Sequence, residues 1–95
     1  MPVDLLKACA IFQLMAAIAR GEKVSPYTLA RSYAEFLLAD MIQALDCGVP
    51  RSEVIWALAV SAGCERAVAS SVLRKVLREA KYVPPEKLGP ANELG

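Results

Sequence analysis

The first half of the chain carries two long apolar runs with helical spacing, separated by a short polar turn. The first run extends from Leu5 to Ala19, and apolar side chains occupy most of its circumference. A helix that is apolar nearly all round is expected to be buried on several sides. Asp4 can cap the start of this helix, and Gly21 supplies a left-handed residue for its end.

The second run begins at Ser25-Pro26, a serine cap followed by proline at the first helical position. Pairs of apolar residues then recur every three to four positions as far as Leu45, and Gly48 follows. The pattern predicts one continuous helix of about twenty residues, roughly 30 Å long, as the central element of the fold.

Two shorter helices are predicted in the second half. Pro50 or Ser52 begins the third helix, and Gly63 ends it. The fourth helix begins near Glu65 and extends to about Lys81. Its apolar stripe faces inward, and its opposite side is polar and mostly basic.

Residues 83–95 contain three prolines and two glycines, a composition that predicts a flexible tail. No repeat and no alternation of apolar and polar residues typical of strands is present. The sequence therefore predicts an all-α protein: a compact four-helix domain over residues 1–82, followed by a disordered tail.

Composition adds a prediction about assembly. The chain is 56 % hydrophobic, which is high for a small monomer with much surface and little interior. Alanine-rich helix packing and contact with another chain both explain this excess. We expect a homo-oligomer, with residues 1–48 as core and dimerisation helices and residues 50–82 as a separate functional pair.

The residue types argue against catalytic and metal chemistry. Cys9, Cys47 and Cys64 have no metal-ligand spacing, and the chain contains no histidine. Ser70-Ser71 therefore lacks a histidine partner that could activate a nucleophile, and no glycine-rich phosphate loop occurs. We expect a protein that is not an enzyme and that uses no metal and no cofactor.

Reduced cysteines fit a cytoplasmic location. The apolar run of residues 5–19 follows no basic segment of the kind found in signal peptides. It is also shorter than the roughly 20 residues that a helix needs to span a bilayer. We therefore expect no membrane association.

Charge is distributed unevenly although the net charge is only +1. Residues 1–50 carry four basic and five acidic side chains, whereas residues 51–87 carry seven basic and four acidic ones. The basic excess of the second half is a weak indication of nucleic-acid binding.

The segment IWALAVSAGCERAVASSVLR, from Ile55 to Arg74, resembles the helix-turn-helix of bacterial and phage DNA-binding proteins. Ala59 supplies the small residue where two steeply crossing helices touch, and Gly63 tolerates the positive φ of the turn. Leu58 and Val72 fall at positions that point into the angle between the helices. The resemblance covers about a fifth of the chain.

The resemblance implies that one face of the second helix meets the major groove of double-stranded DNA. The positions that it assigns to this contact are Glu65, Arg66, Ala67, Ser70, Ser71 and Arg74. Arginine can bind guanine through two hydrogen bonds, and serine can bind bases or phosphates. Lys75, Arg78 and Lys81 would then lie near backbone phosphates. Ala69 departs from the family, which usually has a branched aliphatic residue at that position.

Two functions remain open. The first is a small DNA-binding regulator, transcriptional or a plasmid or phage accessory protein, that acts as a dimer through its helix-turn-helix. The second is a helical protein-protein interaction module, such as an adaptor or an inhibitor of a larger complex. In the second case Trp56 and the apolar excess form the partner surface, and the pattern of residues 55–74 reflects only two helices joined at a glycine.

Overall fold

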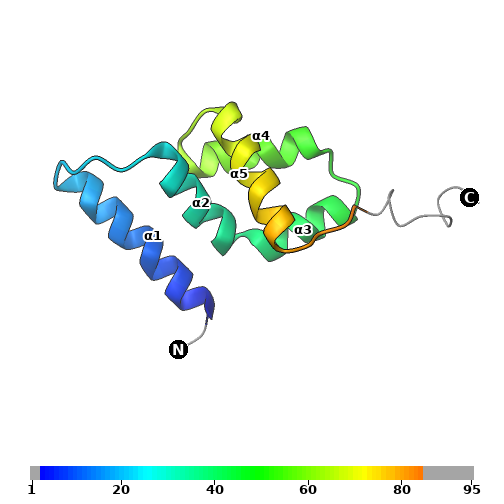
Figure 1. Cartoon of the computed structure of the whole chain (residues 1–95), viewed down its shortest axis with the longest axis horizontal. Helices are drawn as coiled ribbons and strands as arrows, with labels where there is room; N and C mark the ends of the chain where they lie inside the picture. Colours follow the sequence, from blue (N-terminus) through cyan, green and yellow to red (C-terminus); the bar gives the residue numbers. More distant parts are fainter. Residues whose placement is uncertain (1–2, 85–95) are drawn as a thin grey trace, which may run out of the picture.

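The computed structural model describes residues 3–84, and this part of the chain contains helices and no strands. Figure 1 shows the helices in chain order: α1 (Val3–Ala19), α2 (Pro26–Phe36), α3 (Leu38–Asp46), α4 (Arg51–Ala62) and α5 (Arg66–Glu79). The all-α prediction is confirmed, but the predicted count of four helices is wrong. None of these helices combines the length and hydropathy that crossing a bilayer requires.

The core lies where α2, α4 and α5 meet. Helix α5 is the best covered element, and its Val72 and Leu73 are completely buried. Ala30 and Ala34 of α2 are also fully buried, and their small side chains allow the neighbouring helices to approach closely. Met41, Val54, Leu58, Ala59, Ala62, Ala69, Val76 and Leu77 complete this cluster.

The predicted second helix is broken at Leu37 into α2 and α3 (Figure 1). Leu37 has φ −98° and ψ 8°, and it serves as the C-cap of α2 and the N-cap of α3. Neither proline nor glycine occurs at the break, so no local signal marks it. The change of direction allows α3 to pack against α4, with Met41 buried in the shared core.

Helix α1 is less buried than its composition predicted. It packs mainly against α2 (Figure 1). Ile11 and Ala17 are buried, whereas Leu5, Leu6, Phe12, Met15 and Ile18 remain exposed. The predicted cap is also wrong, because α1 begins at Val3 and therefore includes Asp4.

Most of the predicted helix ends are confirmed. Ser25 Oγ accepts a hydrogen bond from the backbone N–H of Tyr27 at 3.1 Å, as expected of the cap before Pro26. Pro50, rather than Ser52, precedes α4. The glycines after α1, α3 and α4 all have positive φ, which the sequence predicted for Gly21 and Gly63. Of the predicted tail, residues 85–95 lie outside the described part.

Side-chain bonds tie distant helices together at the end of α5. Arg31 of α2 donates hydrogen bonds to Glu79 of α5 and to Glu35. The bond to Glu79 is the largest cause of a raised Arg31 pKa, and desolvation opposes it. Tyr82 donates to Asp46 Oδ1 at 2.9 Å, which connects the segment after α5 to α3.

Candidate nucleic-acid interface on α5

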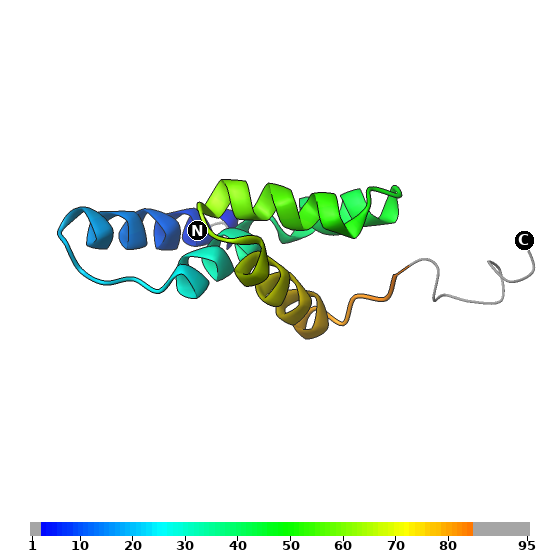
Figure 2. The same ribbon diagram turned by 90° about the horizontal axis from the view of Figure 1, so that it is seen from above.

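The turn between α4 and α5 is short because Gly63 closes α4 in the left-handed conformation, with φ 68° and ψ 37°. The N–H of Cys64 donates to the carbonyl of Ala59 at 3.0 Å, which satisfies an end of α4. The extended residue Glu65 then directs the chain into α5. As a result, α4 and α5 run in clearly different directions (Figures 1 and 2).

The inner side of this helix pair has the burial that its residue types predicted. Leu58, Ala59 and Val72 are buried, and Ala69 is completely buried between the helices. Cys64 is half-buried, and burial raises the pKa of its thiol. The alanine that departs from the family pattern is therefore a contact point of the core.

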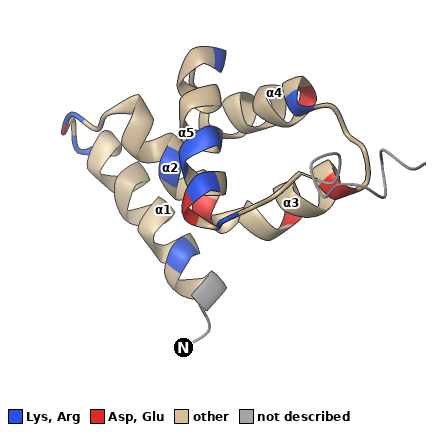
Figure 3. Cartoon of the chain, turned by 45° about the vertical axis from the view of Figure 1, so that its right-hand side comes forward, with Lys and Arg blue, Asp and Glu red and all other residues tan. Residues whose placement is uncertain are grey.

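The outer side of α5 presents a row of polar and basic side chains. Ser71, Arg74, Lys75 and Arg78 are all exposed, and their spacing places them on one face of the helix. Lys81 is also exposed and follows the helix end. In Figure 3 basic residues recur along α5, whereas the charged residues of α3 are acidic.

The basic side chains of this row form no ion pair with the acidic side chains of residues 5–84. The ion pairs within residues 5–84 join Arg20 to Glu22, and Arg31 to both Glu35 and Glu79. The α5 cations at positions 74, 75 and 78 take part in none of these pairs. The one acidic residue near the end of the helix, Glu79, is paired with Arg31 and turned toward α2.

Two of the predicted contact residues are placed less favourably. Ser70 is partly buried, so less of its side chain is accessible than that of Ser71. Glu65 is exposed at the N-cap of α5, and its side chain makes no capping hydrogen bond. Its negative charge still lies at the positive end of the helix dipole, which is electrostatically favourable.

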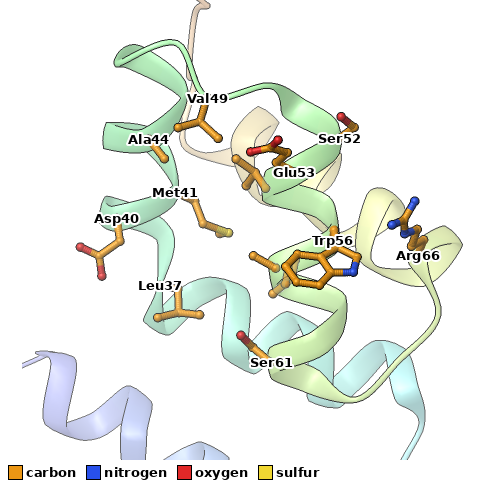
Figure 4. Close-up of a pocket in the computed structure, with 13 residues that line it drawn as sticks. Leu37, Asp40, Met41, Ala44, Val49, Ser52, Glu53, Trp56, Ser61 and Arg66 are labelled. Atoms are coloured by element: carbon orange, nitrogen blue, oxygen red, sulfur yellow. The ribbon is translucent and has the colours of Figure 1, made fainter.

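Arg66 is separated from the outer row. It lies on the α4 side of α5, where it lines the same groove as Trp56 and Ser61 (Figure 4). The structure thus brings Ser71, Arg74, Lys75 and Arg78 together, and Arg66 lies outside that face.

The groove that Arg66 borders lies between α3 and α4 and has a volume of about 720 Å³. Met41 points into it from α3, and Asp40 points away from it (Figure 4). Trp56, on the α4 side, is 52 % exposed. The sequence did not reveal this groove, because it exists only where the break at Leu37 turns α3 toward α4.

Comparison of the chain with protein-family models, curated proteins and solved structures finds no match. The geometry of the chain itself must therefore carry any functional argument.

Proposed function

We propose that this protein is a small DNA-binding regulator, transcriptional or accessory to a phage or plasmid, that acts as a dimer and contacts double-stranded DNA with α5. One observation carries the proposal: a row of exposed cations, which form no ion pair with the acidic side chains of residues 5–84, lies on the side of α5 opposite its buried face. The short left-handed turn at Gly63 and the different directions of α4 and α5 (Figures 1 and 2) support it, because a reading helix must keep one face free of its neighbours.

Different residues of the row are assigned different roles. Ser71 and Arg74, in the first half and middle of α5, are placed for contact with base edges. Lys75 and Arg78 lie farther along the same face, where contact with phosphates supplies affinity without sequence information. Arg66 lies outside this row, at the first position of α5, and is assigned a phosphate contact that positions the helix.

A salt titration tests the proposal. Binding of the chain to a library of random double-stranded 30-mers would be measured by fluorescence anisotropy near 50 mM salt and at rising salt. The affinity should fall steeply as salt rises: a plot of the logarithm of the association constant against the logarithm of the salt concentration should have a slope of about −0.9 per neutralised phosphate. Arg78→Ala, which removes a cation assigned to phosphate, should weaken binding to this random-sequence library by about tenfold, whereas Arg51→Ala, an exposed arginine at the start of α4, should leave it unchanged.

The control variant Arg51→Ala removes one positive charge outside α5, so it shows how much of any loss in binding comes from net charge alone. If Arg51→Ala and Arg78→Ala weaken binding equally, the contact is diffuse and α5 is not the reading helix. Absence of binding by the parent chain near 50 mM salt would contradict the DNA-binding function itself. Helical content of both variants, measured by circular dichroism, should equal that of the parent because both side chains are exposed.

The second candidate function is a protein-protein interaction module. The groove between α3 and α4, with the half-exposed Trp56 at its side, favours it. A tryptophan beside an apolar groove is a common anchor of helix recognition. Such a contact responds weakly to salt, so raising the salt concentration should weaken binding to a protein partner much less than binding to DNA. A protein partner should also stay bound to the chain after nuclease treatment, which removes partners held only through DNA.

A further inference from the structure

Helix α1 carries a second apolar stripe on the side that α2 leaves uncovered. Its members recur at alternating intervals of three and four residues: Leu5, Ala8, Phe12, Met15 and Ala19. Phe12, at the centre, is 67 % exposed. This spacing is the seam of a helix pair, and the stripe contains no charged side chain. At about 1.5 Å per residue, α1 offers a seam roughly 25 Å long.

We propose that the occupant of this stripe is α1 of a second copy of the chain, packed antiparallel. The small Ala8 is followed along the stripe by the large Phe12, so the pairing that sets Ala8 of one copy against Phe12 of the other matches a small residue with a large one. The same register sets Leu5 of each copy against Met15 of the other, so two large apolar side chains meet in the outer layers, and the match of small with large is confined to the two central layers. Facing helices pack best when large and small residues oppose each other.

A parallel pairing lacks this match. In that arrangement each residue meets its own copy, so two Phe12 rings crowd one layer and two Ala8 methyl groups leave a gap in the next. The antiparallel register is compatible with two-fold symmetry, in which one patch contacts the same patch on its partner. The absence of charge in the seam means that self-pairing brings no like charges together.

This inference deepens the dimer of the proposed function and rests on it for biological meaning, although α1 rather than α5 carries it. Sedimentation equilibrium without DNA measures it directly. The parent chain should be a dimer at about 100 µM, and Phe12→Glu should raise the dissociation constant at least about 30-fold. Val60→Glu, which places the same charge at an equally exposed apolar residue of α4, should remain as dimeric as the parent.

Disulfide trapping tests the orientation, in a background with Cys9→Ser, Cys47→Ser and Cys64→Ala. A mixture of Ala8→Cys and Phe12→Cys chains should cross-link under mild oxidation, whereas each alone should not. In the antiparallel register, identical positions at 8 or 12 are offset by about 6 Å along the axis, and packed helix axes are themselves about 8–10 Å apart. The combined separation places their Cα atoms beyond the roughly 7 Å limit for a disulfide. Cross-linking of Ala8→Cys alone would establish a parallel pair and overturn the register.

The two proposals fail separately. A parent chain that is monomeric at about 100 µM, or a Val60→Glu variant that dissociates as strongly as Phe12→Glu, overturns the α1 interface. Neither result affects the comparison of Arg78→Ala with Arg51→Ala on DNA. Conversely, the parent chain could form a dimer that Phe12→Glu dissociates and still bind no DNA. That result would support the α1 interface and contradict the DNA-binding function.

Discussion

Helices α1 and α5 both contain many apolar residues, but the two helices differ in how much of their apolar surface is buried. In α5 the apolar residues share one face, which is buried against α2 and α4, and the other face is basic and exposed. In α1 they surround the helix, and Leu5, Leu6, Phe12, Met15 and Ile18 stay exposed after α2 has covered one side.

The difference shows that the arrangement of apolar residues, more than their number, decides how much a single chain can bury. A helix with one apolar stripe is satisfied by one set of neighbours. A helix that is apolar all round needs neighbours on several sides, and this chain provides one main neighbour for α1. The uncovered remainder of α1 is the surface that a second copy is proposed to cover.

The largest expected effect compares the same substitution in the two helices. Leu73→Ala, at a completely buried side chain of α5, should lower the free energy of unfolding by about 3 kcal/mol, because it creates a cavity in the core. Leu6→Ala, at a side chain of α1 that is 54 % exposed, should cost less than about 1 kcal/mol. Urea denaturation at low micromolar concentration measures both, below the range where dimerisation adds stability.

Equal costs for the two leucines would break the comparison, since α1 would then contribute as much to the core as α5. Repeating the titration at about 100 µM sharpens it. The parent chain should gain stability with concentration, because binding that favours the folded state raises its apparent stability.

A smaller effect concerns the turn that directs α5 away from α4. Gly63→Ala should destabilise the fold by about 1 kcal/mol, because φ 68° is strained for a residue with a Cβ. A Cβ at this position would meet no atom of another segment within 4 Å, so the cost comes from the local backbone conformation and not from a clash with a neighbouring helix. Gly63→Asn should cost less than Gly63→Ala, because asparagine tolerates the left-handed region. The reverse order, measured by thermal unfolding, would contradict a purely conformational cost.

The smallest expected effect concerns the bond between α2 and the end of α5. A double-mutant cycle of Arg31→Gln and Glu79→Gln should give a coupling energy of about 0.5 kcal/mol. Both side chains are partly exposed, so solvent screens the pair and high salt should reduce the coupling further. A coupling above about 2 kcal/mol would show that this pair, rather than apolar packing, fixes α5 in place.

Much of the fold could be predicted because its signals are local. Ser25-Pro26 starts α2, and glycines follow the ends of α1, α3 and α4, since these residue types satisfy or permit the backbone at helix ends. The apolar stripe of α5 and its basic outer row also follow from spacing alone. The roles assigned to Ser71 and Arg74 remain predictions.

The sequence by itself determined which segments are helical, where most of them end and which side of α5 turns outward, because these depend on neighbours within one or two helical turns. Only the tertiary structure decided the break at Leu37, the groove that this break opens, and the displacement of Arg66 toward Trp56. It also decided that α1 keeps an apolar side uncovered. Each of these depends on packing between segments that are far apart in the chain, and an apolar residue carries no record of which neighbour will cover it.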